Sequence, residues 1–260
     1  MPTRLQIARE SWRRLGEFMP AMRRTWLAML VYVGLNVAAA VTLALGAVIA
    51  RRVPHGAIVV QSALLSWAAG WFYVGFWRHR LAYRQRYAAQ AYRHLCVRFL
   101  MPALVAGAAA ACLPILVSGE RLLPPALALG LAAYLLLTVC LLESRGREIF
   151  WSWDVRSFVY SVFPERAQVM TSGVFAWLRH PLYSAGVRWV FALALLRNNA
   201  PALICAAMIA VAFRCMGFLE ERELAEHDPQ YATYWRRIPA VFSPHPLRFW
   251  RFLLTGKNDP

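Results

Sequence analysis

Residues 25–50 read TWLAMLVYVGLNVAAAVTLALGAVIA and contain no charged side chain. About 20 consecutive apolar residues are enough for a helix to cross the hydrocarbon core of a bilayer. The rest of the chain has the same character, since 60% of its 260 residues are hydrophobic and only 16% are charged, whereas about a quarter of a soluble domain is charged. The sequence therefore predicts an integral membrane protein.

Further apolar blocks follow the first one, so we predict an all-α, polytopic membrane protein with about six transmembrane helices. The fifth block holds 15 residues, which is about 22 Å of helix, and it crosses the bilayer only if flanking residues help. The six predicted spans are residues 25–50, 56–77, 99–118, 123–142, 182–196 and 200–218.

The charge distribution predicts the orientation of these spans. The formal net charge is +16, and Lys257 is the only lysine among 29 basic residues. With six spans, 23 of these basic residues fall on one side of the membrane and 4 on the other, while Arg188 and Arg214 lie inside spans. By the positive-inside rule, both termini are cytoplasmic, and this explains the charge without a nucleic-acid partner. The preference for arginine over lysine suggests a GC-rich bacterial genome, and hence the inner (cytoplasmic) membrane.

The five cysteines and six histidines predict neither a disulfide framework nor a metal site. No two cysteines form a C-x-x-C pair, and the histidines show no ligand-type spacing. Cysteines in apolar blocks are more often small hydrophobic residues of helices.

The polar residues that could support chemistry are concentrated after residue 143. We therefore divide the chain into an interfacial basic helix at 1–24, a four-helix transmembrane anchor at 25–142 and a catalytic region at 143–260. Within the first segment, residues 4–19 are amphipathic and basic, as in helices that lie on a membrane surface; a solvated leader without fixed structure is the alternative. The catalytic region combines a helical hairpin, 182–218, with a cytoplasmic tail that carries the interfacial aromatics Phe249, Trp250 and Phe252.

Two charged clusters flank the hairpin on its cytoplasmic side. The cluster RHPLY, residues 179–183, precedes the incoming arm, and the cluster EERE, residues 220–223, follows the outgoing arm. Because a hairpin returns to the side it left, the two clusters are expected to lie close together. Guanidinium and carboxylate groups together suit a zwitterionic ligand, although a charged collar that only positions the hairpin is an alternative. Tyr231 and Tyr234, three residues apart, share one helix face and are read either as part of the site or as surface anchors.

The order GVFAWLRHPLYSAG (173–186), apolar hairpin, EERELAEHDPQYATYWRRIPAVFSPHP (220–246) resembles the isoprenylcysteine carboxyl methyltransferase and phospholipid methyltransferase superfamily. Members of this superfamily are integral-membrane enzymes that use S-adenosylmethionine. The resemblance covers roughly residues 170–246, and the first 140 residues are similar only in being transmembrane helices. Three positions depart from the family pattern: Ala185 stands where a glycine is usual, with Gly186 one place later, and Asp228 and Ala240 replace a glycine and a basic residue.

The resemblance implies a cofactor pocket with three sides. Glu220 and Glu221 would form one wall, and they are also the candidates for proton transfer. The opposite wall and the cytoplasmic closure would be formed by the other predicted cofactor-binding residues, Arg179, His180, Pro181, Tyr183, Tyr231 and Tyr234.

Arg188 is the remaining candidate catalytic residue. An arginine inside a span is costly and often functional, so it is predicted to contact an anionic substrate head group, with snorkelling to the interface as the alternative. The expected substrate is a membrane lipid or lipophilic small molecule with a carboxyl, amine or thiol acceptor. Two other functions remain open: an NADPH-dependent, sterol-reductase-like membrane enzyme and a non-catalytic transport or assembly protein.

Overall fold

The computed structural model describes residues 23–53, 55–146 and 170–257, together with the isolated positions 16, 19, 159, 161–163 and 165. This part of the chain is helical and contains no strand. The all-α, polytopic fold class predicted from the sequence is therefore confirmed. The predicted interfacial helix at 4–19 falls almost wholly outside the described residues.

Five helical segments of the described chain are long and apolar enough to cross a membrane. The first is α2 (Thr25–Arg52), and the second joins α3 (Gly56–Gly70) to the π-helical turn η2 (Trp71–Trp77). The third runs from Arg80 to Leu116, and the other two are α7 (Pro125–Arg145) and α11 (Ala200–His227). The remaining predicted span, the fifth along the chain, is α10 (Pro181–Arg197), whose 17 residues extend for about 25 Å.

The third segment is bent within its basic part, before the sequence becomes apolar at residue 99. It comprises α4 (Arg80–Tyr87), η3 (Ala88–Gln90), α5 (Ala91–Leu95), η4 (Cys96–Leu100), α6 (Met101–Cys112) and η5 (Leu113–Leu116). The bend occurs at Ala88, which has a positive φ of 45°. The basic stretch 78–98 is thus a helical extension of the third span.

Prolines and asparagines determine where the helices of the C-terminal half begin. Proline occupies the first turn of α7, α10 and α11, where its missing N–H is not needed and its fixed φ suits the helix. The Asn199 side chain caps α11 by accepting from Ala202 N at 2.9 Å. Its neighbour Asn198 ties the α10–α11 turn to the start of α7, because its Oδ1 accepts from Leu123 N at 3.0 Å and its Nδ2 donates to Leu123 O at 2.7 Å.

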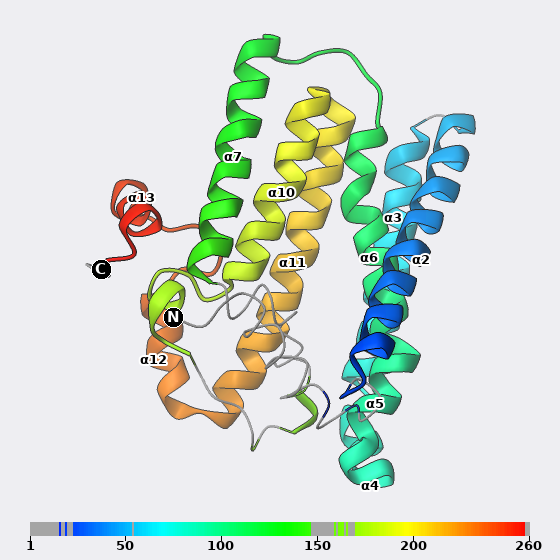
Figure 1. The fold of residues 1–260 in the computed structure, drawn as a ribbon, viewed down its shortest axis with the longest axis vertical. Coiled ribbons are helices and arrows are strands. Elements are labelled where there is room, and N and C mark those ends of the chain that lie inside the picture. The colour runs from blue at the N-terminus through cyan, green and yellow to red at the C-terminus, as the bar shows by residue number, and fades with distance from the viewer. Residues whose placement is uncertain are drawn as a thin grey trace.

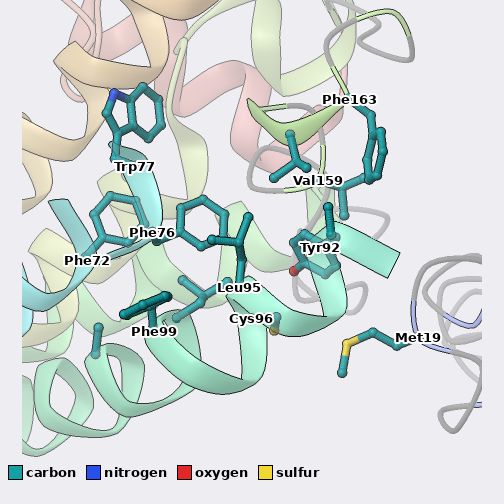
Figure 2. Packing of buried hydrophobic residues seen from close by; sticks show 14 of the residues in the cluster. Met19, Phe72, Phe76, Trp77, Tyr92, Leu95, Cys96, Phe99, Val159 and Phe163 are labelled. Carbon is teal, nitrogen blue, oxygen red and sulfur yellow. The ribbon is translucent and has the colours of Figure 1, made fainter. Parts of the chain in front are cut away.

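The helices form two groups that share one bundle (Figure 1). In the first, α2 packs against α3 and α6; in the second, α10 packs between α7 and α11, and α11 also contacts α3. The first group has a core of buried aromatic and aliphatic side chains around Phe72, Phe76, Leu95 and Phe99 (Figure 2). The predicted boundary at residue 143 separates α7 from the hairpin, yet α7 makes its main contacts with α10.

The C-terminal helix α13 (Pro246–Thr255) packs against the protein. Phe249 and Phe252 are buried beside Trp177 and Leu142, and the Trp177 and Phe252 rings stack at 5.6 Å. The prediction that Phe249 and Phe252 are interfacial anchors is therefore wrong. An amphipathic sequence shows that one face is apolar, and only the fold decides whether lipid or protein covers it.

Candidate functional site

The first cluster is positioned by the start of α10. Pro181 is the first residue of this helix, so Arg179 and His180 immediately precede it. Their backbone N–H groups donate to Pro239 O at 2.9 Å and Ala240 O at 3.0 Å. The segment that follows α12 (Pro229–Arg237) is thereby attached to the entrance of α10.

Glu221, near the end of α11, is the centre of the site. Its side chain is fully buried, and His180 Nε2 lies 2.9 Å from its Oε1. Arg179 Nη1 lies 3.2 Å from the same oxygen, and Arg214 Nη1 lies 3.4 Å from Oε2. A buried carboxylate is costly unless it is paired and hydrogen-bonded, and here three basic side chains surround it.

Glu220 and Tyr183 form the second contact between the two arms of the hairpin. The Tyr183 hydroxyl donates to Glu220 Oε1 at 2.5 Å, while His180 Nδ1 lies 3.7 Å from Glu220 Oε2. The Tyr183 ring is sandwiched between His180 and Phe213, with both centroid distances at 5.3 Å. The structure thus brings together the RHPLY and EERE clusters that the sequence predicted to be neighbours.

Two glycines allow the helices to approach this closely. A Cβ at Gly217 would lie 3.2 Å from His180 Nε2, and a Cβ at Gly186 would lie 2.8 Å from the Phe213 ring. Gly186, one place later than the family pattern, therefore faces α11. Ala185 is buried in the other direction, among the side chains around Leu142.

The two predicted closing tyrosines lie on α12, with ring centroids 5.6 Å apart. Tyr231 is 3% exposed, and Tyr234 donates to the Phe175 carbonyl at 2.7 Å. Burial raises the pKa of both phenols above the ordinary value, and the nearby Glu221 carboxylate adds to this effect. Both side chains therefore remain protonated donors at neutral pH.

Arg179 has unused hydrogen-bonding capacity inside this cluster. Its Nε is buried and has no hydrogen-bond partner in the described chain, and its Nη1 pairs with Glu221 without hydrogen-bond alignment. The guanidinium lies over the Trp235 ring at 5.8 Å. A buried donor without a partner is uncommon in a folded protein, and it marks a position where an anionic ligand group fits.

Arg188 lies outside this cluster, although it belongs to the same helix as Tyr183. It is 6% exposed and donates to Ser184 O at 3.0 Å, to the Ser184 hydroxyl and to Val241 O at 3.5 Å. Its guanidinium also lies 4.8 Å from the Phe242 ring centroid. Arg188 therefore holds the segment after α12 against α10.

Sequence reasoning missed three contributors to the site. Arg214 pairs with Glu221 from two helical turns away, and its charge inside a span was a usable signal. Ser184 donates to Val241 O at 2.7 Å, a contact with no sequence signature. Arg80 on α4 pairs with Glu223 at 2.5 Å, joining the first helix group to α11.

The described residues include no group of three or more His, Cys, Asp or Glu side chains placed to hold a metal ion. The site instead combines arginine, carboxylate and phenol groups on the walls of a helical hairpin. Such groups bind a polar organic ligand through charge-assisted hydrogen bonds.

Comparison with known proteins finds a family match over part of the chain. No curated protein and no solved structure matches the chain significantly. Residues 126–227 match the family model described as phospholipid methyltransferase. This range begins within α7, contains all of α10 and ends with α11, so it includes every residue of the His180–Glu221 contact. The match confirms the resemblance found in the sequence: residues 126–227, which we call the family segment, are similar to the phospholipid methyltransferase family.

Proposed function

We propose that the protein is an S-adenosylmethionine-dependent methyltransferase that acts on a membrane lipid or lipophilic small molecule. One observation carries the proposal: within the family segment, Arg179, His180 and Tyr183 meet Glu220 and Glu221 across a helical hairpin. The ammonium group and the carboxylate of a zwitterionic amino-acid ligand would both find groups of opposite charge there. The apolar helices around the hairpin suit a lipophilic substrate.

The residues of the site fit this cofactor. The unpartnered Nε of Arg179 would donate to the carboxylate of its methionine part, and Glu220 would accept from its ammonium or ribose hydroxyls. Tyr231 and Tyr234 would close the site from α12 as protonated phenols. When bound, S-adenosylmethionine supplies a methyl group already activated by a sulfonium centre, so the main tasks of the protein are alignment and exclusion of water.

The two glutamates have different surroundings, and we assign them different roles. Glu221 is engaged by His180, Arg179 and Arg214, which favours a role in holding the site together. Glu220 is partly exposed, at 13%, and shares its carboxylate with the Tyr183 hydroxyl. For an amine acceptor, Glu220 is the better candidate to receive the proton that must leave before attack. A carboxylate or thiolate acceptor needs no such base.

Calorimetric titration of the purified full-length protein tests the cofactor assignment. S-adenosylhomocysteine should bind, and NADPH should not. His180→Ala and Glu221→Gln should each weaken S-adenosylhomocysteine binding at least about tenfold, since each loses a charge-assisted hydrogen bond. Glu226→Gln is the matched control, because this glutamate lies on the same helix in an exposed pair with Arg222.

Two results would refute the cofactor assignment. The first is parent-like affinity in both site variants when circular dichroism shows that they are folded. The second is binding of NADPH in place of S-adenosylhomocysteine, which would support a reductase. If S-adenosylhomocysteine binds, the methyl acceptor can be identified next. The protein is incubated with a lipid extract and radiolabelled S-adenosylmethionine, and the labelled product identifies the acceptor.

We further propose an inner-membrane location with both termini in the cytoplasm, supported by the distribution of arginines. A reporter fused after Pro260 should be active in the cytoplasm. A short tag inserted at Glu120, in the exposed α6–α7 loop, should be accessible from outside the cell. The α10–α11 turn, on the same side, is a poorer place for the tag, because its Asn198 is 7% exposed and bonded to Leu123. A tag at Glu120 that is protected in intact cells would reverse the proposed orientation.

A further inference from the structure

A surface pocket lies outside the family segment. It has a volume of about 250 Å³ and lies along α4, α5 and η4. We call it the α4–α5 groove, and its lining residues are Tyr83, Tyr87, Arg93, His94, Val97 and Arg98.

The groove occupies the outer face of a helix whose inner face forms the core. Tyr92, Leu95, Cys96 and Phe99 are buried and belong to the same core cluster as the aromatic side chains of η2 (Figure 2). The intervening residues 93, 94, 97 and 98 are exposed. Their side chains are therefore not required for the core, and Arg93, His94 and Arg98 present polar groups at the surface.

Among the described residues, no carboxylate balances the positive charge of the groove. The sequence contains no aspartate or glutamate between Glu17 and Glu120. Arg80 and Arg84 are paired with Glu223 and Glu165. In contrast, neither Arg93 nor Arg98 lies within ion-pair distance of a carboxylate in the described chain.

The hydroxyl groups of the groove are also placed to bind an anion. Arg98 Nη1 donates to the Tyr83 hydroxyl at 3.2 Å, so the phenol proton of Tyr83 is available for another acceptor. Tyr87 stacks on His94 with the centroids 4.2 Å apart, and this contact fixes one wall. A site with two guanidinium groups and two phenols is complementary to a phosphate group.

Neighbouring tryptophans place the groove at the depth of lipid phosphates. Trp71 Nε1 donates to Arg98 O at 3.0 Å, and the Trp67 and Trp71 rings stack at 5.5 Å. Both rings are exposed, at 46% and 40%. Exposed tryptophans on a transmembrane helix are typical of the membrane–water interface, which is where phospholipid head groups lie.

We propose that the α4–α5 groove binds the phosphodiester head group of an anionic phospholipid. Arg93 and Arg98 neutralise the phosphate, the Tyr83 and Tyr87 hydroxyls contact the polar head group, and the exposed Val97 contacts the first acyl carbons. The bound lipid is distinct from the methyl acceptor, because none of the residues that line the groove belongs to the candidate site. Since Arg80 joins α4 to Glu223 of α11, an occupied groove also stabilises the attachment of α4 to the helix that carries the candidate site.

Native mass spectrometry of the full-length protein in neutral detergent tests this site. The protein is titrated with dioleoyl phosphatidylglycerol and, separately, with dioleoyl phosphatidylcholine. The parent should bind one phosphatidylglycerol more tightly than phosphatidylcholine, and Arg93→Gln/Arg98→Gln should weaken that binding at least about tenfold. Arg51→Gln/Arg52→Gln is the matched control, because these two arginines are exposed at the other end of the first two spans.

Further measurements identify the ligand and show whether the variants are folded. Arg93→Lys/Arg98→Lys should keep most of the preference for phosphatidylglycerol, and the glutamine variant should retain parent-like circular dichroism and S-adenosylhomocysteine binding. If the glutamine double variant does not fold, the single variant Arg93→Gln takes its place, with an intermediate loss expected. Parent-like phosphatidylglycerol binding in a folded glutamine variant would overturn the proposal. So would equal binding of the two lipids by the parent, or equal competition by inorganic phosphate at the same concentration.

Discussion

Helices α2 and α10 are both apolar, yet they occupy opposite environments. Helix α2 has 28 residues and is mainly exposed, with only Ala28 and Gly46 buried among its described residues. Helix α10 has 17 residues, and ten of them are buried, including Tyr183, Ser184 and Arg188. A lipid-facing helix must be long and free of charge, whereas a helix enclosed by protein can be short and carry polar groups. The site lies on the enclosed helix for this reason.

The buried polar groups of the two helix groups differ in the same way. In the first, the Gln61 amide of α3 donates to Ala110 O at 3.1 Å and to Cys205 O at 3.0 Å, so a neutral side chain links three helices. In the second, the Glu221 carboxylate is surrounded by Arg179, His180 and Arg214. The neutral link serves packing, while the charged cluster retains capacity for a ligand.

The largest expected effect comes from removing the central charge. Glu221→Gln leaves three basic side chains without their counter-charge, and breaking a buried ion pair costs about 3–5 kcal/mol. Gln61→Leu removes two neutral hydrogen bonds and should cost about 1–3 kcal/mol. Thermal unfolding of both variants in the same detergent measures the difference. An equal or larger loss for Gln61→Leu would show that the two groups are not distinguished by charge.

Arg188→Leu tests whether the enclosed helix positions the segment that follows α12. Its loss removes one of the two side-chain donors to Val241 O, leaving Ser184, and loosens the chain that Arg179 and His180 hold by backbone bonds. Because small misplacements near reacting atoms are costly, methyl transfer should fall at least about tenfold. S-adenosylhomocysteine affinity should change less than in Glu221→Gln, since Arg188 does not touch the cluster.

Single-turnover rates and calorimetry separate the outcomes for Arg188. Arg188→Lys, which keeps the charge and a donor, should restore part of the rate. Parent-like methyl transfer in Arg188→Leu would reduce this arginine to a packing role. A loss of affinity as large as that in Glu221→Gln would make the Val241 segment part of the cofactor site.

The smallest effects come from glycines in the two kinds of helix, and they should have opposite signs. Gly186→Ala pushes a Cβ into the Phe213 ring, which stacks on Tyr183, and should cost about 1–3 kcal/mol. Gly34→Ala in α2 meets nothing within 4 Å and should gain up to about 1 kcal/mol from helix propensity. Opposite shifts of the unfolding midpoint would sharpen the contrast between the enclosed and the lipid-facing helix. Destabilisation by Gly34→Ala would contradict it and indicate a partner on that face of α2.

Many of the helix boundaries could be predicted because their signals are local. The span predicted at 56–77 coincides with α3 and η2 together, and α10 begins one residue before the predicted start, at Pro181. The end of α11 could not be predicted from hydropathy. The helix continues from residue 218 to His227 because Glu220, Glu221 and Glu223 find basic partners from other segments, and these partners compensate for the polarity of its last turns.

The same distinction applies to the candidate site. The proximity of His180 and Glu221 followed from the sequence, since a hairpin brings its two ends together whatever packs around it. The contacts of Arg214 and Arg188 depend on how α10 and α11 are rotated about their axes, and rotation is decided by packing.

The sequence by itself determined that this is a membrane protein, where its apolar helices lie and which two clusters meet. These properties depend on hydrophobic length and on the closure of a short turn, and both are local. Only the tertiary structure decided that α10 is enclosed by α7 and α11, that α13 covers Trp177 and that Arg80 joins α4 to α11. Each of these depends on which apolar face meets another helix and which meets lipid. Both environments select apolar side chains, so the sequence does not distinguish them.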